Sequence, residues 1–368
     1  MKMKRVLAVV GTRPEAIKMF PLIAELKKRE GIVCRVLSTG QHGEMLDSAL
    51  AEFGIVPDIR LVTMREGQTL NGLSARLLQK LPEVLREEAP SVVLVHGDTT
   101  TAAISALAAF NEQIPVAHVE AGLRTGDMKS PFPEEFNRRL ISLAASLHFA
   151  PTVRAAEELL REGIASERIF VTGNTVHDTL GYTVRDDYWS ARLEWARGSR
   201  LLLLTAHRRE SRGARMREAL LGIRDVILSR KGVKAIFPVH PSPSASAVAF
   251  EVFRDCESVM LTEPLSTTEF HNLIARSYLV ITDSGGVQEE APSLSVPVLL
   301  IRDKTERTEE LTSGAVIIGG TDRRTVSDTL SELLDGGSAY VAAKRAKSRA
   351  IGGAARSIAD IIVKYTVG

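Results

Sequence analysis

The sequence predicts an α/β protein made of two Rossmann-like, doubly wound domains that face a cleft. Short runs of aliphatic and β-branched residues alternate with amphipathic helical stretches along nearly the whole chain, and this alternation is typical of parallel sheets with helices on both faces. The pattern weakens between residues 171 and 199 and then restarts. With 368 residues, the chain is long enough for two domains of about 100–200 residues each.

The first half of the chain opens with a β-branched apolar run at 5–10, which predicts a strand. Pro14 follows closely and suits the first turn of a helix, which we expect at 14–29. The same reasoning predicts strands at 34–38, 92–95 and 116–118, and helices at 44–53, 70–87, 100–110 and 133–148. The core stripe of the last helix is expected to be Phe136, Leu140, Leu143 and Leu147.

The second half repeats this alternation of strands and helices. Strands are expected at 201–204, 235–237, 259–261, 279–282 and 298–301, and helices at 214–228, 244–253 and 267–276, with another starting at Val287. We therefore expect one domain at 1–172 and a second at 173–350. A final helix, expected at 354–366, follows Gly352-Gly353 and would pack back on the first domain.

The composition is that of an ordinary globular protein. A formal net charge of +2 and 25% charged residues give no sign of a nucleic-acid-binding surface or an acidic tail. The cysteines, Cys34 and Cys256, are too few for a disulfide framework and are typical of a reduced cytosolic protein. No stretch is long and apolar enough to span a bilayer. We therefore expect a soluble, cytoplasmic protein with neither a membrane nor a nucleic acid as partner.

The stretch from 278 to 307 is expected to carry an anion-binding turn. The apolar run at 279–282 predicts a buried strand, and the turn Ser284-Gly285-Gly286 follows it before a helix begins. Adjacent glycines let a ligand approach the backbone, and a helix start offers unpaired N–H groups, which together suit a phosphate or pyrophosphate. The alternative is a plain tight turn with Ser284 as the helix N-cap. Glu290 is placed to accept from ribose hydroxyls, and Arg307 lies just past the next strand.

Acidic residues gather near strand ends in the first half: Asp98, Glu120 and Glu134. The carboxyl ends of parallel strands are where open α/β sheets bind ligands. Each acid also has a purely structural explanation. Asp98 could cap the next helix, and Glu120 could pair with Arg124. Glu134 could interact favourably with the dipole of its own helix. Because all of them occur at such positions, we interpret them as one shared site.

Basic residues follow strand ends in both halves. Arg13 and Lys18 follow the first strand and could reach a phosphate, but the G-x-G-x-x-G and G-x-x-x-x-G-K-[ST] patterns are absent, which disfavours NAD and P-loop chemistry. His207, followed by two arginines, could surround a pyrophosphate with donors, whereas His240 is interpreted as a loop histidine. The eight histidines are scattered without an H-E-x-x-H motif, so no metal is expected.

With these residues assembled, the chain closely resembles the non-hydrolysing UDP-N-acetylglucosamine 2-epimerases. The resemblance covers nearly the whole chain through the blocks GTRPEAIK, GQHGEML, VHGDTTT, HVEAGLRTGD, SPFPEEFNR, VTGNTV, TAHRRES, TDSGGVQEEAPSL and RDKTER. It implies the GT-B arrangement shared with many nucleotide-sugar glycosyltransferases, with catalytic carboxylates in the first domain and UDP bound by the second. The implied reaction interconverts UDP-N-acetylglucosamine and UDP-N-acetylmannosamine without a cofactor. A homodimer serving cell-envelope polysaccharide biosynthesis is also implied.

The resemblance further implies roles for single residues. The catalytic positions are Asp98, Glu120, Glu134 and His207. The positions that bind the UDP part are Arg13, Lys18, Ser284, Gly285, Gly286, Glu290 and Arg307. A second UDP-N-acetylglucosamine, which activates many bacterial members, would lie near Gln41, Glu44 and Arg65. Gly67 stands where an arginine is expected, so this activation is expected to be weakened or lost.

Departures from the family pattern leave related activities open. Thr308 replaces the proline of a T-E-R-P block, Ser242 alters an H-x-N-P block, and the N-P-Y-G-D-G block near the C-terminus is missing. The alternatives are a glycosyltransferase of the same architecture, a UDP-sugar sensor without turnover, a hydrolysing 2-epimerase, and a 2-epimerase of a UDP-2,3-diacetamido uronic acid. The three carboxylates and His207 favour an epimerase over the first two.

Overall fold

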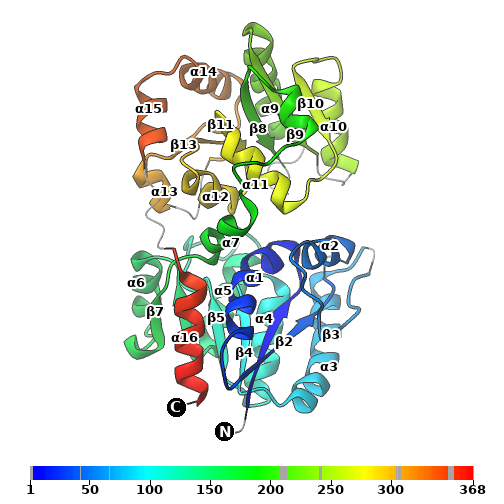
Figure 1. The fold of residues 1–368 in the computed structure, drawn as a ribbon, viewed down its shortest axis with the longest axis vertical. Coiled ribbons are helices and arrows are strands. Elements are labelled where there is room, and N and C mark those ends of the chain that lie inside the picture. The colour runs from blue at the N-terminus through cyan, green and yellow to red at the C-terminus, as the bar shows by residue number, and fades with distance from the viewer. Residues whose placement is uncertain are drawn as a thin grey trace. The chain divides into compact units, whose positions relative to one another are not determined.

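The computed structural model describes residues 3–41, 43–65, 67–206, 214–239, 243–303, 305, 308–346 and 352–367. Contacts divide the chain into two compact units (Figure 1). Unit 1 comprises Met1–Gly181 and Ala350–Gly368, and unit 2 comprises Tyr182–Arg349. The change from one unit to the other falls within helix α7 (Thr175–Thr183).

Unit 1 is a parallel sheet with helices between successive strands. Within its described residues the sheet has seven strands in the order β3-β2-β1-β4-β5-β6-β7, and the paired neighbours run parallel. The strands are β1 (Lys4–Val10), β2 (Ile32–Ser38), β3 (Ile59–Arg60), β4 (Val92–His96), β5 (Val116–Val119), β6 (Leu147–Ala150) and β7 (Ile169–Val171). The helices besides α7 are α1 (Arg13–Lys27), α2 (Glu44–Glu52), α3 (Leu70–Glu88), α4 (Thr100–Asn111), α5 (Glu134–Ala144), α6 (Val153–Arg161), the 3-10 turn η1 (Ser166–Arg168) and α16 (Ala354–Val367).

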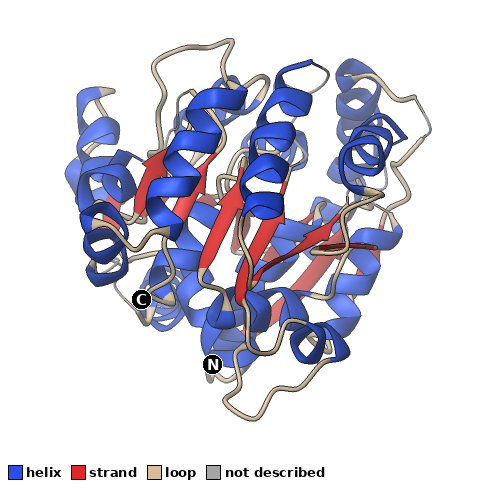
Figure 2. Cartoon of the chain, turned by 90° about the horizontal axis from the view of Figure 1, so that it is seen from above, coloured by secondary structure: helices blue, strands red, loops and turns tan. Residues whose placement is uncertain are grey.

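Unit 2 repeats this plan. Its described strands form a six-stranded parallel sheet in the order β10-β9-β8-β11-β12-β13. The strands are β8 (Arg200–Thr205), β9 (Val233–Pro238), β10 (Val259–Thr262), β11 (Leu279–Thr282), β12 (Val298–Leu300) and β13 (Val316–Ile318). The helices are α8 (Ala191–Trp195), α9 (Ala214–Ser229), α10 (Pro243–Phe253), α11 (Thr267–Arg276), α12 (Val287–Ser293), α13 (Thr308–Ser313), α14 (Arg323–Leu334) and α15 (Ser338–Arg345). The strands, red in Figure 2, lie between helices shown in blue.

Both sheets have the strand order of doubly wound folds. In unit 1 the chain winds outward from β1 to β3 and restarts beside β1 with β4, and unit 2 does the same from β8 to β10 and then β11. The point between β1 and β4, and the point between β8 and β11, are topological switch points, where such sheets bind ligands at the strand carboxyl ends. The prediction of two Rossmann-like domains is therefore confirmed.

Alternate residues of the central strand of unit 1 enter two separate cores. Val6 and Val10 of β1 pack on the face covered by α1, α2 and α16, whereas Leu7 and Val9 pack on the face covered by α3, α4 and α5. A pleated strand turns successive side chains to opposite faces. These four side chains are at most 2% exposed, so both faces of the sheet are covered at its centre.

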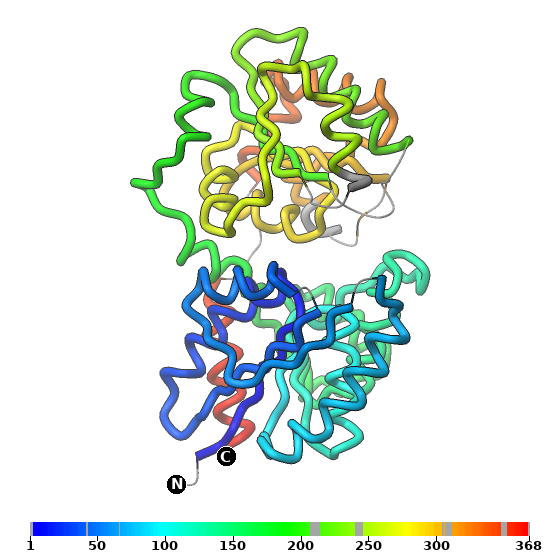
Figure 3. The backbone as a smooth tube through the Cα atoms, turned by 90° about the vertical axis from the view of Figure 1, so that its right-hand side faces the viewer, coloured from blue at the N-terminus to red at the C-terminus, as the bar shows by residue number. Residues whose placement is uncertain are grey.

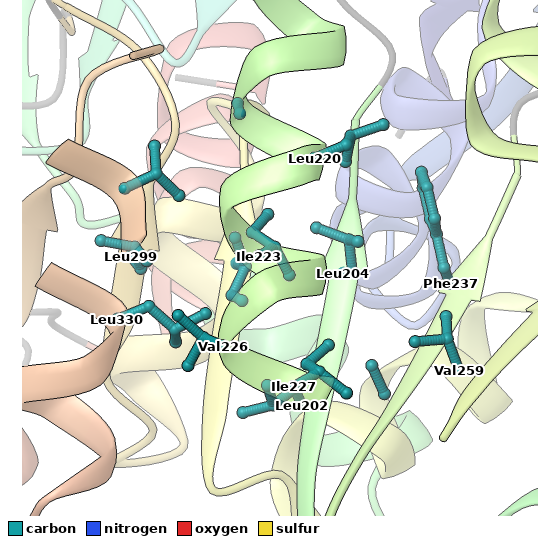
Figure 4. Close-up of a cluster of buried hydrophobic side chains, with 14 of the residues drawn as sticks. Leu202, Leu204, Leu220, Ile223, Val226, Ile227, Phe237, Val259, Leu299 and Leu330 are labelled. Atoms are coloured by element: carbon teal, nitrogen blue, oxygen red, sulfur yellow. The ribbon is translucent and has the colours of Figure 1, made fainter. Parts of the chain in front are cut away.

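Unit 2 buries its sheet in the same way. Leu202 and Leu204 of β8 pack against α9, where Ile223 lies between the helix and the sheet (Figure 4). Leu201 and Leu203 belong to the opposite core, which α11 and α12 help to form. The strand ends are thus held on a rigid two-sided core, which positions the turns that follow them.

The last helix completes the core of unit 1. α16 packs against α1 (Figure 3), and Ile358 is fully buried in the cluster that also contains Leu22. The carboxylate of Asp178 accepts hydrogen bonds from the backbone N–H groups of Gly353 and Ala355 at 2.8 Å each. These bonds fix the start of the helix after the glycine pair.

The helix expected at 133–148 is shorter in the structure, and its predicted core stripe is wrong at Phe136 and Leu143, whereas Leu140 does pack against the core. α5 ends before residue 145, and residues 147–150 form β6, which pairs with β5. Phe136 is 50% and Leu143 is 78% exposed, while Ile141 is fully buried. Leu147 is buried as a strand residue. The apolar run at 147–150 pairs with β5 as a strand of the sheet. This tertiary pairing overrides the helical spacing of apolar residues on which the prediction was based.

None of the helices in the described part of the chain is both long enough and apolar enough to cross a membrane. α3 spans 19 residues, which approaches the necessary length. It carries charged residues on successive turns, among them Arg76, Lys80 and Glu83.

Truncating Ile358 tests the packing of α16. We expect Ile358→Ala to lower the free energy of unfolding of unit 1 by about 2–4 kcal/mol, because it leaves a cavity in a closed core. The matched control is Lys364→Ala on the exposed face of the same helix, which should change stability by less than about 0.5 kcal/mol. Urea unfolding followed by circular dichroism measures both, and equal midpoints for the two variants would contradict the packing described.

Candidate active site

The turn after β4 carries Asp98. Gly97 has a φ of +64°, in the left-handed region that glycine adopts without strain. The N-cap of α4 is Thr99, whose side chain accepts a hydrogen bond from the backbone N–H of Ala102. The suggestion that Asp98 only caps this helix is therefore wrong.

Asp98 is held by the first turns of α5. Nη2 of Arg138 donates to Oδ2 of Asp98 at 2.5 Å, and Nδ2 of Asn137 donates to the backbone oxygen of Asp98 at 2.9 Å. The Arg138 side chain is only 4% exposed, whereas the Asp98 side chain is 29% exposed. Asp98 is thus fixed from the protein side and reachable from the solvent side.

Glu134 is the first residue of α5. Residues three and four positions apart share a helix face, so Glu134 lies on the same face as Asn137 and Arg138, which contact Asp98. An acid in the first turn also interacts favourably with the helix dipole. Glu134 therefore lies one helical turn before the two residues that hold Asp98.

Glu120 follows β5 and is held by side chains from α1 and from the turn before α7. Oε1 accepts from Nζ of Lys18 at 2.5 Å and from Nδ2 of Asn174 at 3.0 Å. Nε2 of His96 lies 3.8 Å from Oε2. Glu120 itself has a φ of +65°, which costs a non-glycine residue about 1 kcal/mol or more and persists where the surroundings enforce it.

The alternative partner suggested for Glu120 has another role. Nε and Nη2 of Arg124 donate to the two carboxylate oxygens of Glu162 at 2.8 and 2.6 Å. The ion pair between Glu120 and Arg124 is therefore wrong. Because a Cβ built on Gly97 would lie 3.4 Å from Oε2 of Glu120, the Glu120 carboxylate sits directly beside the Asp98 turn.

A buried histidine supports the turn that carries Asp98. Nε2 of His118 lies 2.7 Å from the backbone oxygen of Gly97, and the His118 side chain is fully buried. Burial lowers the pKa of His118 to about 3, and that of its strand neighbour His148 to about 4. His118 is therefore neutral at physiological pH and donates the Nε2 proton to Gly97.

In unit 2, the ends of β8 and β11 are linked by hydroxyl groups. Oγ1 of Thr205 and Oγ1 of Thr282 share a hydrogen bond of 2.6 Å, and Thr282 also accepts from the backbone N–H of Ser284 at 2.9 Å. The N-cap of α12 is Gly286, with no side-chain capping bond. Ser284 is therefore not the helix cap, and its turn with Gly285 stands ahead of the helix.

Glu290, on α12, has a buried histidine as neighbour. Nε2 of His271 lies 3.8 Å from Oε2 of Glu290, and Nδ1 of His271 shares a hydrogen bond of 2.7 Å with Oγ1 of Thr183. His271 is 1% exposed. The buried ring therefore lies beside the Glu290 carboxylate, beyond hydrogen-bond distance.

The remaining predicted residues are placed as follows. Arg13 is the first residue of α1. His207 and Arg307 lie outside the residues that the structure describes. Oε1 of Gln41 accepts from Oγ1 of Thr101 at 2.6 Å. Glu44 begins α2, and the backbone N–H of Arg65 donates to Oε1 of Gln68 at 3.3 Å.

Sequence reasoning missed the residues that hold the predicted site residues in place. Arg138 and Asn174 occur within the blocks EEFNRR and VTGNTV. The sequence therefore shows where they stand along the chain, but not that they contact Asp98 and Glu120. His271 has no local signal, because its partners come from α7 and α12. In the described parts of the chain, no three histidines, cysteines or acids are grouped as a metal would require.

A sequence model of the family Epimerase_2, described as UDP-N-acetylglucosamine 2-epimerase, matches residues 24–363. The chain is similar to the UDP-N-acetylglucosamine 2-epimerase of Bacillus subtilis (strain 168), with 48% identity over 334 residues, which are 91% of this chain and 88% of that protein.

The chain is also similar to solved structures of UDP-GlcNAc 2-epimerases. The UDP-GlcNAc 2-epimerase from Neisseria meningitidis, in a crystal structure with bound UDP-GlcNAc, has a TM-score of 0.92 and 38% identity, covering 98% of this chain and 100% of that one. The UDP-GlcNAc 2-epimerase from Methanocaldococcus jannaschii, in complex with UDP-GlcNAc and UDP, has a TM-score of 0.85 and 32% identity, covering 98% and 99%.

The buried histidines predict loss of stability in acid. The pKa of His118 is depressed in the folded state, so its contribution is complete above the unfolded value of about 6.5 and is lost as the pH falls from there towards about 3. We expect the free energy of unfolding to fall by up to about 1.4 kcal/mol per pH unit for each such histidine.

Replacing His118 by glutamine isolates this contribution. Above about pH 8 the histidine is neutral in both states, so the difference between wild type and His118→Gln there reports packing and the hydrogen bond to Gly97, without titration. Between about pH 6 and 4 the difference should shrink, because only the wild type gains a proton on unfolding. Urea unfolding across this range measures it. A difference that is independent of pH would mean that His118 titrates alike in both states.

Proposed function

Because the chain belongs to the UDP-N-acetylglucosamine 2-epimerase family, we propose that it interconverts UDP-N-acetylglucosamine and UDP-N-acetylmannosamine without net hydrolysis. The observation that carries the proposal is the grouping of Asp98, Glu120 and Glu134 around the carboxyl ends of β4 and β5. The relatives from Neisseria meningitidis and Methanocaldococcus jannaschii bind UDP-GlcNAc, which supports a UDP-sugar as substrate.

The reaction has to invert C2 of the sugar, whose proton no adjacent carbonyl makes acidic. We propose that the C1–O bond to UDP breaks and that its electron pair leaves with UDP. The developing positive charge at C1 allows a carboxylate to take the C2 proton, and the C–H electrons form the double bond of 2-acetamidoglucal. Protonation of C2 from the opposite face and return of UDP to C1 complete the inversion. No electron is gained or lost overall.

Proton transfer on both faces requires two acid/base groups, each typically worth ~10²–10⁴-fold in rate. We assign Asp98 to one face and Glu134 to the other. The 29% exposure of the Asp98 side chain and its fixed orientation by Arg138 suit a group that meets a substrate. Glu120 is 8% exposed and already accepts from Lys18 and Asn174, so we assign it the role of orienting and polarising.

We propose that unit 2 binds the nucleotide. The Ser284-Gly285-Gly286 turn would hold the diphosphate through backbone N–H groups and the serine hydroxyl, with no Cβ at the glycines to obstruct it. Glu290 would accept from the ribose hydroxyls. The position of Glu290 in the first turn of α12, four residues after Gly286, favours this because it keeps the carboxylate close to the proposed diphosphate turn.

Departure of UDP also requires positive charge near the phosphates. Preorganised donors at such positions are typically worth about 3–4 kcal/mol each. We propose Arg13, Lys18 and Arg307 as these groups, with His207 serving the departing phosphate. Lys18 brings a positive charge to the carboxyl end of β5, where Nζ donates to Oε1 of Glu120.

Activation by a second substrate molecule, a homodimer and a cytoplasmic location remain predictions. Gln41, Glu44 and Arg65 are the residues proposed for the second site. Oε1 of Gln41 is already engaged by Thr101, so an activator would have to displace this bond or use the amide N–H groups. This supports the expectation of weak activation.

Proton NMR of UDP-N-acetylglucosamine with the enzyme in D₂O tests the reaction. We expect deuterium at C2 and the appearance of both epimers as UDP-sugars. The proton removed by the carboxylate exchanges with solvent before C2 is protonated again, which explains the label.

Each rival activity gives a different result in that experiment. Free N-acetylmannosamine with UDP would indicate the hydrolysing reaction. An unlabelled substrate consumed only with an added acceptor would indicate a glycosyltransferase. An inert UDP-N-acetylglucosamine with turnover of a UDP-2,3-diacetamido uronic acid would indicate the related epimerase, and binding without turnover of either would indicate a sensor.

Asp98→Asn removes a proposed acid/base group without changing its size. We expect kcat to fall by ~10²–10⁴-fold, with the affinity for UDP unchanged because Asp98 is not assigned to the nucleotide. Steady-state kinetics and calorimetric titration with UDP measure the two quantities. Near-normal turnover of this variant would refute the assignment.

Adjacent arginines give a matched pair for the orientation of Asp98. Arg138→Lys removes the planar donor that Asp98 uses, and we expect kcat to fall by about 10–100-fold. Arg139 points instead to Glu135 and Glu162, so Arg139→Lys should change kcat by less than about 2-fold. If kcat falls equally in the two variants, loss of the contact with Asp98 is not the cause of the fall.

A further inference from the structure

A buried carboxylate at the start of α1 takes no part in the proposed reaction. Glu15 is 2% exposed. Its Oε2 accepts from the backbone N–H groups of Gly11 and Thr12 at 2.8 and 2.7 Å. The side chain of Thr12 accepts in return from the N–H of Glu15, which completes a capping box.

The other oxygen of Glu15 reaches a different loop. Oγ1 of Thr99 donates to Oε1 of Glu15 at 2.6 Å. The same hydroxyl oxygen accepts from the backbone N–H of Ala102 at 3.0 Å. Because a hydroxyl has one proton to donate, the helix cap of α4 directs that proton to Glu15. One carboxylate therefore joins the turn after β1 to the turn after β4.

This connection lies at the topological switch point of unit 1, since β1 and β4 are neighbours in the sheet. Dinucleotide-binding folds hold a phosphate there on the N–H groups of the first turn. Here the N–H groups of Gly11 and Thr12 are used by Glu15. The chain thus places its own carboxylate where related folds place a phosphate.

The backbone of Gly11 also lies against two threonine side chains, one of them in the first turn of α4. A Cβ built on Gly11 would lie 2.3 Å from Oγ1 of Thr101 and 2.6 Å from Oγ1 of Thr39. Such distances leave no room for a side chain, so the turn after β1 lies directly on the start of α4. The glycine allows the close approach that the bond from Thr99 to Glu15 then holds.

We propose that Glu15 is a positioning residue that fills the phosphate position of unit 1 and locks the turn carrying Arg13 to the turn carrying Asp98. The inference rests on the proposed function, because Arg13 and Asp98 are there assigned to the substrate. It explains why the first Rossmann turn of this chain has no nucleotide-binding glycine pattern. It also predicts that Glu15 governs turnover more than substrate affinity.

The test compares Glu15→Gln, Thr99→Val, Thr99→Ser and the double variant Glu15→Gln/Thr99→Val. We expect Glu15→Gln and Thr99→Val each to lower kcat by about 10–100-fold, because a small displacement of a catalytic group has effects of that size. KM for UDP-N-acetylglucosamine should change by less than about 3-fold, because the displaced group is Asp98, which acts in the chemical step. Arg13 stays in place because the Thr12 side chain still accepts from the backbone N–H of residue 15. Thr99→Ser, which keeps the hydroxyl, should restore most of the turnover.

The double variant and a remote cap separate positioning from stability. If the two residues act as a unit, the double variant is no slower than the slower single variant. Thr152 caps α6 by accepting from the N–H of Ala155, so Thr152→Val loses a cap of the same kind away from Asp98. Its melting temperature should fall as that of Thr99→Val does, while its kcat stays at the wild-type value.

Two outcomes would overturn the inference. One is a Glu15→Gln variant whose melting temperature falls but whose kcat, measured on folded enzyme, equals that of the wild type. The other is a Thr152→Val variant that loses as much turnover as Thr99→Val. Both differ from failure of the proposed function, which would appear as a wild-type enzyme that puts no deuterium at C2.

Discussion

The parallel pairing of β1, β4 and β5 is the constraint on which the candidate site of unit 1 depends. β4 pairs with β1 on one side and with β5 on the other, so the carboxyl ends of all three strands lie at one edge of the sheet. Each strand leads into a turn and then a crossover segment, as parallel pairing requires. The turns that carry Arg13, Asp98 and Glu120 are therefore neighbours in space although they are far apart in sequence.

Pairing of buried charges then holds these side chains in one arrangement. Lys18 and Glu120 are both 8% exposed, and the 4% exposed Arg138 lies between Asp98 and the fully buried Glu135. Such pairs add little net stability, but each partner is costly to leave alone because a buried charge loses its hydration. The result is a set of fixed dipoles and charges, and preorganisation of this kind is how active sites favour charge that develops in a reaction.

The structure also decides between local and distant explanations of the same residue. Asp98, Glu120 and Ser284 each fit a local role in a cap or an ion pair, and none of them fills that role in the structure. Thr99 caps α4, and Gly286 precedes α12 without any side-chain cap. A local rule states which residues suit a position, whereas tertiary contacts decide which of the suitable residues occupies it.

The sequence by itself determined most of the order of strands and helices, the doubly wound class of both domains, the family, and the placement of acids at strand ends. These features depend on periodicity, turn residues and blocks that extend over a few neighbouring residues. Only the tertiary structure decided that 147–150 is a strand, that Lys18 and Asn174 bind Glu120, and that Glu15 joins two turns. The physical reason is that these contacts join side chains from separate elements, which become neighbours only when the sheet is assembled.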